Sequence, residues 1–203
     1  MSKIESVILG MFFGFVPLVF CLLTTLIITG ILFGTEVIEA WALWSFVPGI
    51  IIDVIFLKKW VKMAYQMSNR ILALLYLFYS VVGLGMGMGV PIFNFVLCIA
   101  AGVYIARRMH LTGADEERRN EAFKRTAVFC AAVMALMCCL ITLWAIAGQM
   151  IGYRLETPLL SLTLTLPIFT AVVLTGGAVL VLLQYLLTSA AAKITSKLLD
   201  NKK

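Results

Sequence analysis

Six long runs of apolar residues, separated by charged or turn-forming segments, constrain the fold of this chain more than any other feature. A helix needs about 20 such residues to cross the roughly 30 Å of hydrocarbon in a bilayer, because it rises about 1.5 Å per residue. Charged residues make up 13% of the 203 positions, whereas soluble domains carry about 25%. The sequence therefore predicts an all-α, polytopic integral membrane protein, with residues 1–203 as a single transmembrane domain. The predicted spans run over about Val7–Phe33, Val37–Leu57, Ile71–Met88, Pro91–Ala106, Thr126–Ile151 and Leu159–Leu187.

The positions of lysine and arginine predict the orientation of these spans. Fifteen of the sixteen Lys and Arg residues precede the first span, follow the last, or lie in the second and fourth connections, and only Arg154 lies on the other side. Positive residues concentrate on the cytoplasmic side of membrane proteins. We therefore expect both termini in the cytoplasm and a location in the cell (plasma) membrane. The connections on the outer side are short, which predicts three antiparallel helical hairpins.

Several function classes are disfavoured by the same residues. The net charge of +6 arises from short clusters between apolar runs, so we expect no nucleic-acid binding. The single histidine, His110, lies in a cytoplasmic connection, and the sequence contains no catalytic motif, so we expect no enzymatic activity and no cofactor. Sulfur ligands select copper(I), but a sulfur-bearing helix face is more often part of a packed core. The four sulfur residues that share one face of the fifth span are Cys130, Met134, Met137 and Cys138.

Glycine occupies every second position near the end of the third span, at Gly83, Gly85, Gly87 and Gly89. In a helix, Gly83 and Gly87 share one face, and Gly85 and Gly89 share a nearly opposite one. Two interleaved small-xxx-small patterns predict close packing of this span against neighbours on both sides. The alternative is an extended segment that exposes its carbonyl groups to a cavity. A phosphate-binding loop is disfavoured because no Lys-Ser or Lys-Thr follows the glycines.

Three prolines, Pro17, Pro48 and Pro167, lie about ten residues into the first, second and sixth spans. Proline inside a helix removes one backbone hydrogen bond and leaves the carbonyl four residues earlier without its donor. Interrupted helices near the bilayer midplane form the binding sites of many transporters. The alternative is structural kinking without a substrate. The carbonyl groups expected to lose their donors are those of Phe13, Trp44 and Thr163.

One acidic residue, Asp53, lies within the second span and is the expected polar anchor of such a site. We therefore expect a cavity for a small solute or ion among spans one, two and six, with Glu39 at its outer mouth. Asp53 is only five residues from Lys58, so either side chain could instead extend to the inner interface. A non-catalytic scaffold, or a subunit of a larger membrane complex, is the alternative function.

The longest connection, residues 107–125, contains the signals of a helix start. Thr112 and Asp115 precede the acidic residues Glu116 and Glu117, which favours a helix that begins in the cytosol and continues into the fifth span. This extension is either a solvated helix or a docking surface for a cytosolic or membrane protein partner. The partner expected along the rest of the chain is the lipid bilayer.

Overall fold

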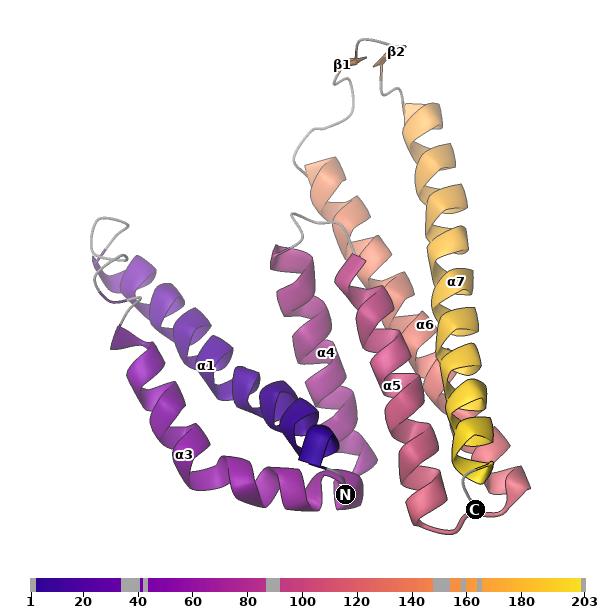
Figure 1. Cartoon of the computed structure of the whole chain (residues 1–203). Helices are drawn as coiled ribbons and strands as arrows, with labels where there is room; N and C mark the ends of the chain where they lie inside the picture. The colour runs from indigo at the N-terminus through magenta and orange to yellow at the C-terminus, as the bar shows by residue number, and fades with distance from the viewer. Residues whose placement is uncertain are drawn as a thin grey trace. The chain divides into compact units, whose positions relative to one another are not determined.

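The computed structural model describes residues 3–33, 41, 44–86, 92–147, 154–157, 160–163 and 166–201. These residues include six long α-helices, which confirms the predicted helical fold class (Figure 1). They also include one short antiparallel hairpin of strands β1 (Arg154–Thr157) and β2 (Leu160–Thr163). The sequence predicts one domain, whereas the chain divides into two compact units, residues 1–68 (unit 1) and residues 69–203 (unit 2).

Unit 1 is a helical hairpin formed by α1 (Lys3–Phe33) and α3 (Phe46–Met63), followed by a short 3₁₀ helix, Ala64–Gln66. The two helices pack antiparallel along most of their length (Figure 1). Gly49 is buried against Leu18, and a Cβ atom built on Gly49 would lie 2.9 Å from the Leu18 Cα atom. The absence of a side chain at residue 49 therefore allows the two backbones to approach closely.

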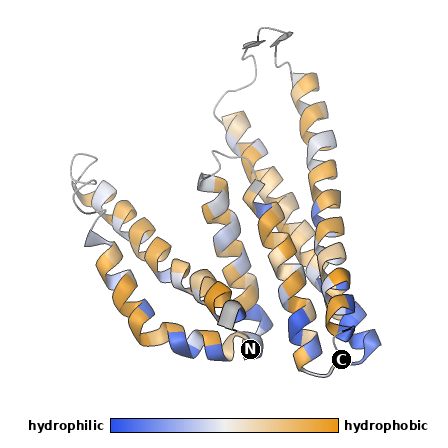
Figure 2. Ribbon diagram, in the orientation of Figure 1, coloured by the Kyte–Doolittle hydropathy of each residue, from blue (hydrophilic) through white to orange (hydrophobic). Residues whose placement is uncertain are grey.

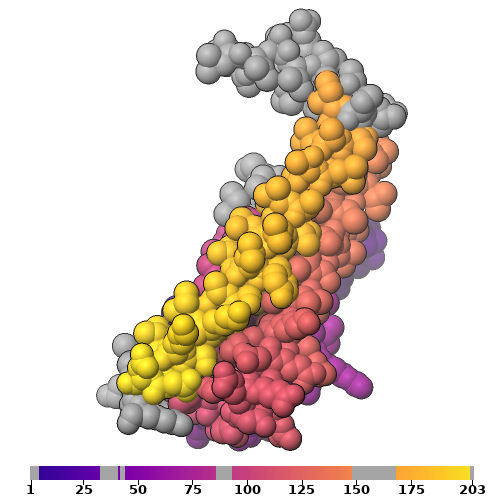
Figure 3. Space-filling model, turned by 90° about the vertical axis from the view of Figure 1, so that its right-hand side faces the viewer, coloured from indigo at the N-terminus to yellow at the C-terminus, as the bar shows by residue number. Residues whose placement is uncertain are grey.

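Unit 2 contains four helices: α4 (Asn69–Met86), α5 (Ile92–Leu111), α6 (Glu116–Ala147) and α7 (Leu166–Asp200). The helices alternate in direction, and α5 and α7 make the most extensive contact. Figure 3 shows α7 lying along α6.

Small residues set the distance between α5 and α7. A Cβ atom built on Gly102 would lie 2.5 Å from the Thr188 carbonyl oxygen. One turn further along α5, Ala106 forms a buried apolar cluster with Ala192 of α7 and Phe123 of α6.

Two helices begin later than their predicted spans. The predicted second span begins at Val37, whereas α3 begins at Phe46. The predicted sixth span begins at Leu159, whereas residues 160–163 form β2 and α7 begins at Leu166. Hydropathy alone cannot place these boundaries, because apolar residues such as Leu160 and Leu162 are compatible with a strand as well as with a helix.

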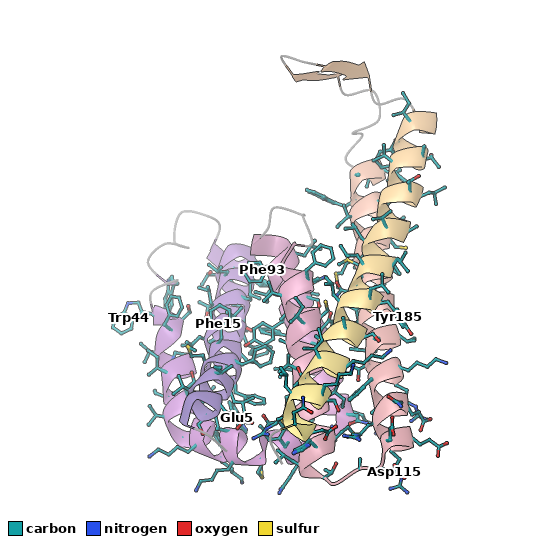
Figure 4. All side chains as sticks on the ribbon, turned by 45° about the vertical axis from the view of Figure 1, so that its right-hand side comes forward. Glu5, Phe15, Trp44, Phe93, Asp115 and Tyr185 are labelled. Atoms are coloured by element: carbon teal, nitrogen blue, oxygen red, sulfur yellow. The ribbon has the colours of Figure 1, made fainter. Side chains whose placement is uncertain are left out.

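The start of α6 agrees with the sequence signals in the fourth connection. The helix begins at Glu116, and the Asp115 Oδ1 atom accepts a hydrogen bond from the Arg118 backbone N–H at 3.1 Å. Asp115 is therefore the N-cap residue, since its carboxylate satisfies one of the donors that the first helical turn leaves unpaired. The Arg125 side chain contacts Glu121 one turn further along, at 2.5 Å. Figure 4 labels Asp115 in the turn between α5 and α6.

The length and composition of several helices are compatible with a membrane protein. Three described segments are long and apolar enough to span a bilayer, namely Glu5–Leu32, Glu116–Ala147 and Ile168–Asp200. A fourth span is added if Phe46–Gln66 and Asn69–Gly85 together form one broken span. The number of six membrane-crossing helices therefore stays a prediction, as does the side on which the termini lie.

The surface of these helices is apolar, as expected for contact with lipid. Val54 in α3 and Trp144 in α6 expose 77% and 71% of their surface, and large apolar patches of this kind are rare on soluble monomers. In unit 2 the hydrophilic residues gather at one end, where α5 ends, α6 begins and α7 ends (Figure 2). This end is called the charged end of unit 2 below.

Candidate functional site

Only one of the three predicted proline interruptions lies inside a helix. Pro17 is buried within the 31-residue α1. Pro48 is the third residue of α3, and Pro167 is the second residue of α7. A first helical turn leaves its N–H groups without a partner in the helix, so proline is tolerated there. Before Pro48, however, the Ser45 N–H donates to the Trp41 carbonyl at 3.0 Å, so a helical turn directly precedes α3. Both prolines therefore lie near the start of a described helix, and an interruption of their spans at mid-depth stays a prediction.

The three residues whose carbonyl groups are predicted to lose their donors lie in different kinds of structure. Phe13 lies four residues before Pro17, so its carbonyl has no helical donor. Trp44 precedes α3, exposes 70% of its surface and points away from the ribbon in Figure 4. Thr163 is in β2, opposite Arg154. Glu39, the predicted residue of the outer mouth, lies outside the described residues.

Asp53 lies where α3 packs against α1. Its Oδ2 atom is 3.5 Å from the Cβ position of Gly14, the residue that follows Phe13. Its Oδ1 atom is buried and has no hydrogen-bond partner. The carboxylate therefore faces α1 rather than extending towards Lys58. We call this arrangement of Asp53, Gly14, Phe13 and Pro17 the Asp53 site.

The Asp53 site contains oxygen acceptors of the kind that bind cations. Gly14 has no side chain, so the carboxylate can approach the backbone of α1 next to the position where Pro17 removes a helical donor. An unpaired carboxylate and a carbonyl oxygen without its donor are both acceptors. Among the predicted site residues, Asp53 lies against Gly14, the residue after Phe13, and Pro17 follows one turn later in the same helix. Thr163 and Pro167 belong to unit 2.

The glycines of the third span differ in their surroundings. A Cβ atom built on Gly83 would lie 2.8 Å from the Phe93 Cβ atom, so this glycine allows α4 and α5 to pack closely. Phe93 lies near the start of α5 (Figure 4). A Cβ atom built on Gly85 would have nothing within 4 Å, so close packing of the second face stays a prediction. Gly87 and Gly89 lie outside the described residues.

A second polar site, in unit 2, was missed by the sequence analysis. Its members come from three helices, are each at most 8% exposed and carry no formal charge. The Gln184 Nε2 atom donates hydrogen bonds to the Tyr76 hydroxyl at 2.7 Å and to the Asn94 carbonyl at 3.0 Å. We call this group the polar centre, and it consists of Tyr76, Ser80, Asn94, Gln184 and Thr188.

Two sulfur residues border the polar centre. Cys130 of α6 lies beside the Tyr76 and Thr188 side chains, and Cys98 of α5 lies beside Thr188. Met134 and Met137 follow on the same buried face of α6. The predicted packing role of the Cys130, Met134 and Met137 face therefore agrees with their position inside the bundle.

Ionic contacts hold the charged end of unit 2 together. Arg119 near the start of α6 binds both carboxylate oxygens of Asp200 at the end of α7, at 2.9 and 3.1 Å. His110 Nδ1 of α5 lies 3.6 Å from Asp200 Oδ1. One carboxylate therefore contacts two other helices. The contact with Arg119 uses one guanidinium nitrogen, Nη1, which donates to both oxygens of Asp200.

Comparison of the chain with protein-family models, with curated proteins and with solved structures found no match. Its function is therefore inferred from the Asp53 site, the polar centre and the charged end of unit 2.

Proposed function

We propose that the chain is a non-enzymatic, multi-pass protein of the plasma membrane that binds or transports a small monovalent cation at the Asp53 site. The observation that carries this proposal is the buried Asp53 Oδ1 atom, which has no hydrogen-bond partner. An acidic side chain within a membrane helix is energetically costly, about 2.5–3.5 kcal/mol on insertion scales, and is therefore a functional candidate.

The backbone of α1 supplies the second part of the argument. In several transporter folds, the backbone carbonyl groups of interrupted helices coordinate the coupling ion, Na⁺ or H⁺. In α1, Pro17 leaves the Phe13 carbonyl without its helical donor. Gly14, the next residue, lies against the Asp53 carboxylate. A small cation beside Asp53 would compensate its charge and give both oxygen types a partner. The proposed site lies between α1 and α3 and does not require α7.

The Asp53→Asn variant tests this proposal. Asparagine keeps the shape of the side chain but removes the negative charge, so we expect cation flux to fall at least about tenfold. The measurement is ²²Na⁺ uptake, together with proton entry reported by a pH-sensitive dye, in proteoliposomes under a potassium diffusion potential. Asp115→Asn is the matched control, because it removes the same charge at an exposed position where asparagine also caps a helix.

The outcomes separate transport from other roles. Equal flux in wild type and Asp53→Asn would rule out transport through the Asp53 site, and so would wild-type vesicles that conduct neither ion. Asp53→Glu retains the charge and is expected to keep part of the flux. A fall of the same size in Asp115→Asn would indicate a loss of general protein integrity instead of a site-specific effect.

The length of α6 favours a second candidate, a scaffold function. The helix has 32 residues, or about 48 Å at 1.5 Å per residue, which exceeds the roughly 30 Å of hydrocarbon. Its first ten residues, 116–125, are mostly exposed and charged. We propose this segment as the docking surface if the chain serves as a subunit of a larger complex. Purification in mild detergent would then yield a stoichiometric partner that is lost when Glu121 and Arg125 are both replaced by alanine.

A further inference from the structure

The polar centre of unit 2 leaves several buried atoms without hydrogen bonds. Gln184 Nε2 has two acceptors, and the Thr188 hydroxyl donates to the Gln184 carbonyl at 2.8 Å. Gln184 Oε1, Ser80 Oγ and both side-chain atoms of Asn94, Oδ1 and Nδ2, are buried and have no partner within the chain. Gln184 and Ser80 are 0% exposed and Asn94 is 1% exposed. Buried polar groups in proteins are nearly always hydrogen-bonded, so this concentration of unpaired atoms requires an explanation.

The unpaired atoms have a definite chemical character. The polar centre contains no charged residue among its members, so it offers a cation no carboxylate and an anion no guanidinium or ammonium group. The Asn94 carboxamide presents one free acceptor and one free donor side by side. Gln184 adds an acceptor, and Ser80 adds a hydroxyl that can donate or accept. This combination complements an uncharged molecule that itself carries an N–H donor next to a carbonyl acceptor.

The packing of the helices limits the size of such a molecule. Thr188 belongs to the polar centre, and its carbonyl oxygen lies 2.5 Å from the Cβ position of Gly102. Gly83, one turn from Ser80 on α4, is similarly close to Phe93, the neighbour of Asn94. Helices that approach this closely exclude a large molecule, so a ligand of the polar centre must have only a few heavy atoms.

The position of the polar centre within its helices is consistent with a site inside the membrane. Asn94 is 13 residues before Arg107 in α5, which places it about 20 Å from the charged end of unit 2. Polar groups at such depth are costly unless paired, and water is scarce there. A bound polar molecule would satisfy Asn94, Gln184 and Ser80 together.

We propose that the polar centre binds a small uncharged amide of the acetamide or urea type, with Asn94 as the residue that pairs with the ligand's amide group. The ligand carbonyl accepts from Asn94 Nδ2, and the ligand N–H donates to Asn94 Oδ1 or Gln184 Oε1. Ser80 provides a further contact. This site lies in unit 2 and is independent of the cation site proposed for unit 1.

Saturation-transfer NMR with acetamide as the probe, on the full chain in detergent, tests the proposal. Wild type is expected to give a saturable signal, and Asn94→Leu is expected to weaken it at least about tenfold, because leucine has the same branched shape without donor or acceptor. Asn120→Ala, which removes an exposed amide of α6, is the matched control and is expected to keep the wild-type signal. Glycerol, which lacks an amide, is expected to give none.

Thermal unfolding without ligand distinguishes a binding role from a structural one. Asn94→Leu removes two buried atoms that have no partner, so its unfolding midpoint is expected to equal or exceed that of wild type. A midpoint below that of wild type, in a folded variant, would show that the Asn94 side chain stabilises the bundle and would overturn the proposal.

Three further results would overturn it. The first is a wild-type protein without a saturable acetamide signal, as expected if only water occupies the site. The second is an Asn94→Leu variant that keeps the signal. The third is glycerol binding as strong as acetamide binding. If Asn94→Leu does not fold, Ser80→Ala decides the question. It removes only a hydroxyl and is expected to weaken the acetamide signal several-fold, and an unchanged signal would overturn the proposal.

Discussion

Replacing Gly102 with alanine is expected to lower the unfolding midpoint of the protein by about 5–10 °C. The new Cβ atom would lie 2.5 Å from the Thr188 carbonyl oxygen, 3.0 Å from the Ala191 Cβ atom and 3.1 Å from the Ala192 nitrogen. Two of these are backbone atoms, which cannot move aside as a flexible side chain can, so α5 and α7 must separate. Overpacking of this kind costs about 1–3 kcal/mol, and about 1 kcal/mol corresponds to about 2–4 °C in a chain of this size.

Circular dichroism during heating in detergent measures this effect, and Gly85 provides the control. A Cβ atom built on Gly85 has nothing within 4 Å, and alanine is favoured over glycine in helices by about 1 kcal/mol. Gly85→Ala is therefore expected to keep or raise the midpoint. Equal midpoints for Gly102→Ala and wild type would contradict the close α5–α7 contact.

Epitope tags inserted after Met67, Gly113 and Lys203 are expected on one side of the membrane, and tags after Met88 and Tyr153 on the other. This all-or-none result follows from six crossings with the lysine and arginine residues on the cytoplasmic side. Protease accessibility of each tag in sealed vesicles of known orientation is the measurement. In right-side-out vesicles, the tag after Lys203 is expected to be protected from external protease.

The tag after Met88 is the decisive one. If only Glu5–Leu32, Glu116–Ala147 and Ile168–Asp200 cross the membrane, Met67 and Met88 lie on the same side. That result would disprove the predicted crossing of the third span, and the tags after Gly113 and Lys203 would then show whether the remaining crossings leave both termini on one side.

Much of the helical fold can be predicted from local sequence. The predicted third span, Ile71–Met88, differs from α4 by two residues at each end. The start of α6 follows from Asp115 and the acidic residues after it, since an N-cap acts on donors within three residues. Such signals are readable because every group involved is close in the sequence.

The proline positions could not be assigned in the same way. Proline occurs both in the interior of membrane helices, where neighbours satisfy the freed carbonyl, and in the first turn of a helix, where no bond is lost. Pro17 is of the first kind and Pro167 lies in a first turn, whereas Pro48 lies in a first turn that directly follows another helical turn. Composition around the three residues is equally apolar, so only the helix boundaries distinguish them.

The polar centre was missed for a different reason. Gln184 lies 108 residues from Tyr76 and 90 residues from Asn94. In the sequence each is a single polar residue in an apolar run, a pattern typical of scattered interhelical contacts. Only the packing of α4, α5 and α7 brings them together. Asp53 could be identified because its charge is unusual in an apolar run, whereas an uncharged amide carries no such signal.

The contact of Arg119 with Asp200 joins α6 and α7 at the charged end of unit 2, so a change in the tilt of one helix there affects the other. Each rod is continuous from this contact to the far end of its helix. Cys130, which touches Tyr76, lies 11 residues from Arg119, or about 16 Å. A tilt of the two helices by about 10° about this contact would displace Cys130 by about 3 Å at that radius. A change in helix tilt at the charged end of unit 2 would thereby alter the packing around Cys130 in the interior of the bundle.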